Sequence, residues 1–151
     1  PVYVRMGRAK VDDVYQSGCP FQWGKGTVLR DGCDAAVIAT GLMVQEALKA
    51  ADILANRGCQ VMVIDMAAIK PLDEDLVVAA AKQTGFVVTA EEHSAIGGLG
   101  SAVAETLSRR CPTRQAYVGI QDCFGESGKA GDLLKEYGLT AEAIVDACLL
   151  A

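Results

Sequence analysis

The stretches "DAAVIATG" (residues 34–41) and "MVQEALKAADILANRG" (residues 43–58) together decide the fold of this chain. The first is a short, continuous apolar run that stops at a glycine, which is typical of a parallel strand covered on both faces. The second places four apolar residues on one helical stripe: Val44, Leu48, Ala51 and Leu54. Gly58 is available to end that helix. A buried strand followed by a helix is the repeating unit of an α/β domain.

The same unit recurs along the chain. Three further runs are strand-like: "CQVMVIDM" (59–66), "FVVTAEE" (86–92) and "RQAYVGI" (114–120). Two further runs are helical: "DEDLVVAAAKQTG" (73–85) and "GGLGSAVAETLSRR" (97–110). Asp73 is suited to cap the first of these helices and Gly85 to end it. Four strands alternating with helices predict a mostly parallel sheet with helices on both faces.

The two ends of the domain differ from this pattern. "GTVLRDG" (26–32) is a brief strand with an Asp-Gly turn, which predicts a hairpin with the next strand and hence an antiparallel edge strand. The tail predicts two amphipathic helices that pack on the domain, over residues 131–138 and 140–151, the second capped by Thr140. We therefore expect a three-layer α/β/α sandwich with a five-stranded, mostly parallel sheet of four parallel strands and one antiparallel edge strand.

Residues 1–25 fit neither pattern. "PVYVRMGR" (1–8) resembles a strand without a partner in this chain, and a polar connector follows it to Lys25. An orphan strand on a linker predicts that a preceding domain has been removed. Because the chain begins with Pro1 rather than Met, we expect a cut-out domain or a processed product. The predicted domain is then residues 26–151.

Composition narrows the class of protein. The 151 residues are 51% apolar with a net charge of -5, which predicts one globular domain and argues against a nucleic-acid partner. Six scattered cysteines without a CxxC motif, and a single histidine, indicate free thiols in a reducing compartment and no metal site. No segment approaches the ~20 apolar residues of a membrane helix and no leader opens the chain, so we expect a soluble, cytoplasmic protein without a membrane partner.

The glycines of "EEHSAIGGLG" (residues 91–100) allow two interpretations. Gly97, Gly98 and Gly100 open a helix after a strand, where backbone N–H groups could bind a phosphate or another anion. Their spacing is G-G-x-G, however, and Val103 takes the place of the third glycine of a dinucleotide fingerprint. We favour a tight strand-to-helix turn, with an anion site as the alternative.

His93 is the only histidine of the chain, and it follows a predicted strand at the edge where open sheets bind ligands. Glu91 and Glu92 lie beside it. No Ser or Cys nucleophile stands in a G-x-S-x-G elbow, and adjacent residues of a strand point to opposite faces. We therefore predict no catalytic residue in this chain, and a role for His93 in an interface or in ordering the loop.

Two further groups are candidates for contacts. "FGESGK" (residues 124–129) reads as a surface loop whose Ser127 or Lys129 could touch a partner, or as a solvated loop. Arg5 and Arg8 in the orphan strand have the side chain that best recognises phosphate or carboxylate groups in a bidentate way. In a complete protein they could reach the site of a neighbouring domain.

Several of these motifs in order resemble the C-terminal part of the transketolase family. The resembling stretches are "PVYVRMGR", "VIATGLMVQEALKAA", "EEHSAIGGLGSAVAE" and "FGESGKAGDLLKEYGLTAEAIV". They cover nearly the whole chain in register and are most similar to the C-terminal subunit of bacterial split transketolases. The resemblance implies a third α/β domain with a five-stranded sheet, in agreement with the fold expected from the residues.

The resemblance also implies where the chemistry lies. Thiamine diphosphate and Mg²⁺ would be bound by upstream domains or a companion subunit that this chain lacks, in a homodimer of the full enzyme. Residues 1–25 would be the end of the preceding pyrimidine-binding domain plus a linker. Arg8 matches an arginine that contacts the sugar phosphate, with Arg5 beside it, and the isolated chain is expected to be inactive. His93 lies outside the family's catalytic set, and the domain would supply domain and dimer contacts.

Three alternatives stay open on the sequence. Two belong to the same superfamily: the C-terminal domain of deoxyxylulose-phosphate synthase and that of a 2-oxoacid dehydrogenase β-subunit. The third is a freestanding regulatory module that binds an anionic metabolite at the sheet edge near His93 and Gly97. The stretches "HSAIGGLGSAV" and "FGESGK" favour transketolase.

Overall fold

A computed structural model describes residues 1–7, 10–15, 18–19 and 21–150. Within them the sheet has five strands: β1 (Thr27–Arg30), β2 (Ala35–Ala39), β3 (Val61–Asp65), β4 (Phe86–Ser94) and β5 (Arg114–Ile120). Five helices accompany it: α1 (Met43–Ala55), α2 (Glu74–Thr84), α3 (Leu99–Arg110), α4 (Ala130–Glu136) and α5 (Ala141–Cys148). Strands and helices therefore alternate from β2 to β5, as the sequence predicts.

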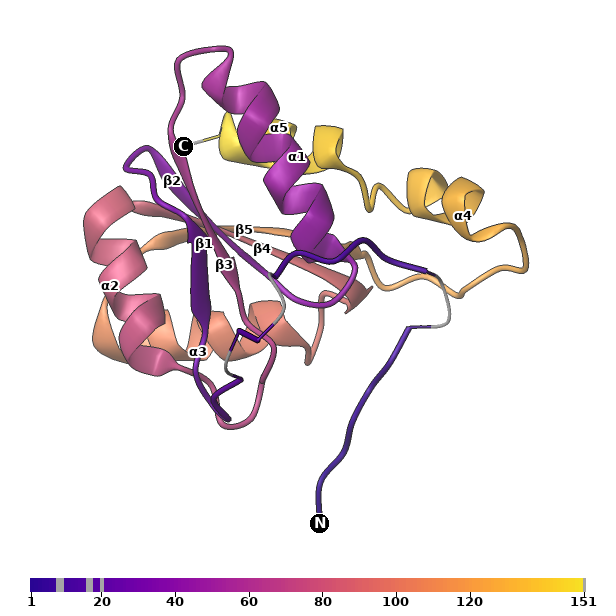
Figure 1. Cartoon of the computed structure of the whole chain (residues 1–151), viewed down its shortest axis with the longest axis horizontal. Helices are drawn as coiled ribbons and strands as arrows, with labels where there is room; N and C mark the ends of the chain where they lie inside the picture. The colour runs from indigo at the N-terminus through magenta and orange to yellow at the C-terminus, as the bar shows by residue number, and fades with distance from the viewer. Residues whose placement is uncertain (8–9, 16–17, 20, 151) are drawn as a thin grey trace.

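The strands lie in the order β1-β3-β2-β4-β5. β2 pairs in parallel with β3 and with β4, and β4 pairs in parallel with β5, whereas β1 is antiparallel to β3 at one edge. Helices α1 and α5 cover one face of the sheet and α2 and α3 the other (Figure 1). This arrangement confirms the predicted three-layer sandwich with four parallel strands and one antiparallel edge strand.

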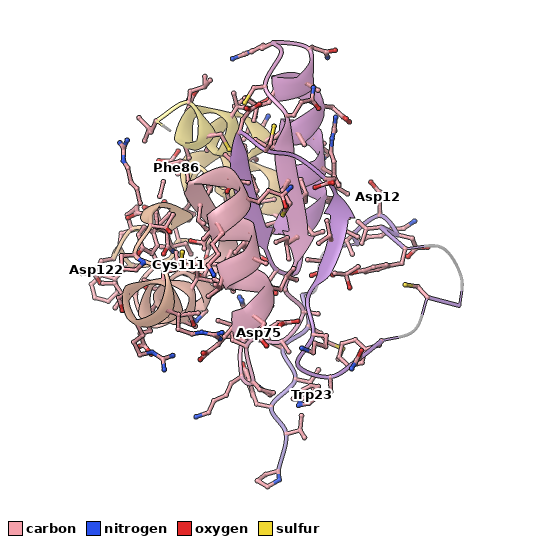
Figure 2. The ribbon with its side chains drawn as sticks, turned by 90° about the vertical axis from the view of Figure 1, so that its left-hand side faces the viewer. Asp12, Trp23, Asp75, Phe86, Cys111 and Asp122 are labelled. Carbon is pink, nitrogen blue, oxygen red and sulfur yellow. The ribbon has the colours of Figure 1, made fainter. Side chains whose placement is uncertain are left out.

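The centre of the sheet is buried because helices cover both of its faces. Every residue of β2 and of β3 is buried, which explains why these strands are continuous apolar runs. Val37 belongs to the core under α1 and α5, whereas the next residue, Ile38, belongs to the core under α2 and α3. Figure 2 looks onto the second face, with Asp75 on α2 and Cys111 directly after α3.

β1 is an antiparallel edge strand as predicted, but the predicted hairpin between β1 and β2 is wrong, because β1 pairs with β3. The connection between β1 and β2 passes over the start of β3, where the N–H groups of Cys33 and Asp34 each donate to the Gln60 carbonyl oxygen at 2.9 Å. Gly32 permits this crossing, since a Cβ there would overlap the backbone of Val61. The fully buried β3 gains more from an inner position than β1, which is half exposed.

The helix ends follow the predicted capping residues. The Asp73 carboxylate accepts the N–H of Leu76 at 3.2 Å at the start of α2, and Gly85 ends this helix in the left-handed region at φ 71°. Thr140 caps α5 by accepting the N–H of Ala143 at 3.3 Å. These local signals are confirmed because each depends only on residues a few positions apart.

The tail forms both predicted helices, but only α5 packs firmly on the domain. Ile144 and Val145 of α5 are buried in the core under α1, whereas α4 has no buried residue and lies apart from the layers in Figure 1. The reason is that only one apolar side chain of α4, that of Leu134, packs against the core. None of the helices formed by the described residues is both long and apolar enough to cross a membrane.

The N-terminal region keeps to the outside of the domain. Residues 1–7 form no helix and no strand and are exposed. Among the described residues of the linker (10–15, 18–19 and 21–25), the Asp12 N–H donates to the Gln45 side chain of α1 at 3.2 Å, and two side chains reach carboxylates elsewhere in the domain. The Tyr15 hydroxyl donates to the Asp65 carboxylate at 2.6 Å, and the Lys25 ammonium lies 3.4 Å from the Asp73 carboxylate. The linker is therefore attached near the carboxyl end of β3 and the start of α2.

Candidate functional site

The connection between β4 and α3 holds most of the predicted site residues. Glu91 lies near the end of β4 with only 2% of its surface exposed. Its carboxylate oxygens accept the N–H groups of Leu99 at 2.7 Å and Gly100 at 2.8 Å, at the start of α3. The first N–H groups of a helix have no partner inside the helix, and negative charge is favourable there. Glu91 therefore caps α3 from the preceding strand.

A different physical reason favours glycine at each of the positions 97, 98 and 100. A Cβ at Gly98 would overlap the Glu91 carboxylate, so only glycine leaves room for this cap. Gly97 has a φ of 79°, which favours glycine, and a Cβ at Gly100 would lie 2.6 Å from the ring of Tyr117. The N–H groups that an external anion would use already bind Glu91. An anion at this turn would have to displace a buried side chain.

His93 lies at the carboxyl end of β4, and Arg5 reaches the neighbouring residue of this strand. This strand extends to Ser94, two residues beyond the predicted end, so His93 is part of it. The His93 side chain is exposed, and its Nδ1 lies 3.0 Å from the Ser94 carbonyl oxygen. The Arg5 guanidinium donates to the carbonyl oxygen of Glu92 at 2.8 Å. Arg8, the other predicted arginine, lies outside the described residues.

The second candidate loop stands apart from this group. Ser127 and Lys129 are exposed in the segment between β5 and α4. The Lys129 carbonyl oxygen accepts the N–H groups of Asp132 and Leu133 at 3.0 Å, which starts α4. Among the described contacts, none joins Ser127 or Lys129 to the Glu91–His93 segment. The structure thus places the two candidate loops after adjacent strands without a bond between them.

Large apolar side chains project from the same edge of the sheet. Ile96, in the turn after β4, is 66% exposed, and Phe124, after β5, is 98% exposed. The turn that carries Ile96 is fixed on both sides, because Ser94 Oγ accepts the Ile96 N–H and Ser101 Oγ accepts the Gly97 N–H. The sequence analysis did not identify Ile96. The signal that could have found it is its position between a polar strand end and two glycines. Exposed apolar groups on a rigid turn are suited to contact another surface.

A cavity of about 330 Å³ lies between the linker and the carboxyl end of β3, and sequence reasoning missed it. Its lining includes Tyr15, Phe21, Lys25 and Asp65, and none of it comes from the His93–Gly100 turn. Asp65 is 8% exposed, and burial raises the pKa of its carboxyl, although the hydrogen bond from Tyr15 partly opposes this. The signal in the sequence was an acidic residue that directly ends a buried apolar run.

Replacing Asp65 with asparagine is expected to stabilise the protein at neutral pH. Because the folded pKa of Asp65 is raised, its contribution to stability is full below the unfolded value near 3.8 and is lost as pH rises through the folded pKa. Asp65→Asn keeps an acceptor for the Tyr15 hydroxyl without the buried charge. Its free energy of unfolding, measured in urea, should exceed that of the wild type at pH 7 and approach it at pH 4.

The matched control is Asp13→Asn, at an exposed linker position. It should change the free energy of unfolding by less than about 0.5 kcal/mol at both pH values. An Asp65→Asn protein that is less stable than the wild type at pH 7 would show that the buried charge is compensated and would overturn this prediction.

Metal ligands do not gather in the described part of the chain. Residues 1–7, 10–15, 18–19 and 21–150 contain no group of three or more His, Cys, Asp or Glu side chains placed to hold a metal ion. The six cysteines are free, and only Cys148 is buried.

Comparison with known proteins places this geometry in context. The family model described as transketolase, C-terminal domain, matches residues 24–144. A solved structure described as a split gene transketolase, inactive beta4 tetramer, superimposes with a TM-score of 0.93 and 49% identity, covering 96% of this chain and 48% of that one.

Two curated relatives agree with this match. The 6-deoxy-6-sulfo-D-fructose transketolase subunit SqwH of Clostridium sp. (strain MSTE9) is 46% identical over 97% of this chain and 46% of its own length. The 1-deoxy-D-xylulose-5-phosphate synthase of Syntrophotalea carbinolica is 48% identical over 80% of this chain and 19% of its own length. The chain thus spans less than half the length of each of these relatives.

Proposed function

Since this chain belongs to the transketolase family, of which it forms the C-terminal domain, we propose that the assembled protein transfers a two-carbon ketol unit between phosphorylated sugars. The observation that carries this proposal is that nearly the whole of this chain matches 46% of a transketolase subunit and 48% of a split transketolase structure. The domain itself supplies contacts to other parts of the enzyme. Its partners are an upstream thiamine-binding region or companion subunit, in a homodimer of the full enzyme.

The carboxyl edge of the sheet is the surface that we assign to these contacts. It carries the exposed side chains of His93, Ile96 and Phe124. Glu91 fixes this edge by tying the end of β4 to the start of α3. A rigid edge with apolar groups flanked by polar ones has the composition of a protein interface. Residues 1–25 are then the end of the preceding domain plus a linker, and residues 26–151 the C-terminal domain, a division supported by the family match over 24–144.

We assign thiamine diphosphate and Mg²⁺ to regions outside this chain. Thiamine diphosphate supplies the stabilised carbanion of ketol transfer when it is bound. The described residues do not offer three grouped ligands for Mg²⁺, and the N–H groups at the start of α3 already bind Glu91. No step of the chemistry is therefore assigned to residues of this chain.

Calorimetry with thiamine diphosphate and Mg²⁺ tests the proposal. The chain alone is expected to give no binding heat, whereas the chain combined with its upstream region and any companion subunit should bind the cofactor. A parallel titration with inorganic phosphate tests the rival binding module at the His93 edge. Phosphate binding by the chain alone, without cofactor binding by the restored assembly, would reject the transketolase function and favour that module.

Deoxyxylulose-phosphate synthase is the second candidate, favoured by the relative from Syntrophotalea carbinolica. The restored assembly, that is, the chain combined with its upstream region and any companion subunit, should be assayed in parallel for ketol transfer and for formation of 1-deoxy-D-xylulose 5-phosphate. A 2-oxoacid dehydrogenase β-subunit, the remaining alternative, would show neither activity and would decarboxylate a 2-oxoacid instead. Each product identifies one member of the superfamily.

Arg8→Ala is expected to weaken the use of phosphorylated sugars by the restored assembly. A guanidinium–phosphate contact strengthens binding by about 1.5–3 kcal/mol, so kcat/KM should fall at least about tenfold, mostly through KM. The comparison is Lys10→Ala, which removes the same charge two residues along the exposed linker. Equal kcat/KM values for the two variants would remove Arg8 from the phosphate site. Arg5→Ala, tested beside them, shows whether Arg5 shares this role.

A further inference from the structure

Cys33 and Cys59 lie just before the amino ends of two neighbouring strands. Cys33 stands two residues before β2 and Cys59 two residues before β3. The parallel register begins with Ala35 beside Val61, and each cysteine precedes one member of this pair by two residues. Ala35 and Val61 belong to the core under α1 and α5, and Cys59 packs against that core.

Direct contacts hold the two cysteines at one place. The Cys33 N–H donates to the Gln60 carbonyl oxygen at 2.9 Å, next to Cys59 in the chain. Asp34 Oδ1 lies 3.8 Å from the Cys33 sulfur, and the other Asp34 carboxylate oxygen accepts the N–H of Gln60, the residue after Cys59. Neighbouring strands are about 4.8 Å apart, within the ~4.4–6.8 Å Cα separation of disulfides. The two cysteines are therefore held beside the contacts between Asp34 and Gln60, at the ends of two neighbouring strands.

We propose that Cys33 and Cys59 form an oxidation site that closes to a disulfide on reaction with a peroxide. Cys33 is exposed and Cys59 half-buried, so a small oxidant reaches the first thiol and the second lies behind it. This disulfide would join the segment between β1 and β2 to the start of β3, over which that segment passes. This site concerns the chain itself and does not depend on the proposed ketol transfer.

The chemistry proceeds in two balanced steps. The Cys33 thiolate attacks one oxygen of hydrogen peroxide, the O–O bond breaks and hydroxide leaves, which oxidises the sulfur to a sulfenic acid. The Cys59 sulfur then attacks the Cys33 sulfur, the S–S bond forms, the S–O bond breaks and the hydroxyl leaves as water. The Cys59 proton leaves in this water, and the proton that Cys33 released on forming its thiolate neutralises the hydroxide of the first step. Two thiols thus lose two electrons and two protons, and peroxide becomes two waters.

The environment of each thiol sets this order. Burial and the Asp34 carboxylate raise the pKa of the Cys59 thiol, which disfavours its thiolate and makes it the second partner rather than the first. Cys148 is close to Cys59 but buried, and burial raises the pKa of its thiol to about 12. Cys148 therefore stays reduced while Cys33 reacts.

Peptide mapping of peroxide-treated protein tests the site. The full chain in a Cys19→Ser/Cys123→Ser background, which removes two other exposed thiols, is treated under native conditions with hydrogen peroxide. It is then alkylated and cleaved with trypsin, which separates the two cysteines because Lys49 and Arg57 lie between them. A cross-linked peptide containing Cys33 and Cys59, two hydrogen atoms lighter than the sum of its parts, is expected. Dithiothreitol should abolish it.

Two variants and one physical control make the test decisive. Cys59→Ser should leave Cys33 as a sulfenic acid that dimedone traps, and Cys33→Ser should leave Cys59 unmodified. The cross-linked protein should unfold cooperatively at a Tm no lower than that of the reduced protein. The proposal is overturned by a Cys59–Cys148 bond in place of the expected one, by a cross-link that forms only in denaturant, or by irreversible Cys33 oxidation with Cys59 still reduced.

Discussion

Replacing Glu91 with alanine is expected to lower the free energy of unfolding by about 3 kcal/mol, because two buried N–H groups lose their only acceptor. These are the N–H groups of Leu99 and Gly100, which the Glu91 carboxylate accepts at 2.7 and 2.8 Å. The variant also removes negative charge from the positive end of α3, which adds to the loss. For a domain of this size the Tm should fall by roughly 6–12 °C. Urea unfolding and a thermal melt followed by circular dichroism measure both quantities.

Glu92→Ala is the matched control. It removes the same charge from the next residue, whose side chain is only half-buried and whose backbone carbonyl makes the described contact with Arg5. Its effect should stay below about 1 kcal/mol. Equal losses for the two variants would mean that negative charge at this edge, and not the cap on α3, determines stability.

The second large effect is expected for Gly32→Ala. A methyl group at this position would overlap the backbone of Val61 and Met62, and backbone cannot rotate out of the way as a side chain can. Either the crossing between β1 and β2 shifts or β3 moves, and both disturb the buried centre of the sheet. We expect a loss of about 3 kcal/mol in the free energy of unfolding, measured by urea denaturation.

Gly125→Ala provides the comparison for this variant. Gly125 lies in the exposed segment between β5 and α4, and a Cβ there would meet no atom within 4 Å. The substitution should leave stability within about 0.5 kcal/mol of the wild type. A Gly32→Ala protein as stable as Gly125→Ala would show that the crossing has room for a side chain and that the path of the chain over β3 is different.

The helix caps show what sequence reasoning reaches well. Asp73 and Thr140 each bond an N–H group three residues further along the chain, so the pattern and the contact span the same short stretch. The apolar runs of β2 and β3 were equally readable, because a strand covered on both faces has no polar side to display. The layer order of the fold follows from these two kinds of signal.

The pairing of β1 could not be predicted from local sequence signals. An Asp-Gly pair after an extended run is a strong local signal for a hairpin, and here it is followed by a crossing instead. The local preference was overridden because β3, which follows β1 after a strand and a helix, occupies the place beside it. Contacts over such a separation are not written in any short stretch of sequence.

The candidate site divides in the same way. The sequence located the turn from Glu91 to Gly100 and its glycines, but it treated Glu91 as one of two acids beside a histidine. Only the structure shows that Glu91 turns inward to cap α3 while His93 remains exposed. The side of a strand to which a residue points depends on what covers that side, and α3 is the element that covers Glu91.

The sequence by itself determined the α/β class, the alternation of strands and helices, the caps and the membership of the transketolase family. Each of these rests on apolar periodicity or on motifs within a short stretch, where neighbouring residues interact through a short length of backbone. Tertiary structure alone decided that β1 lies beside β3, that Glu91 caps α3, and that Cys33 bonds to Gln60 beside Cys59. These contacts join residues that are distant in the chain, and the burial of apolar surface by the whole sheet determines which of them form.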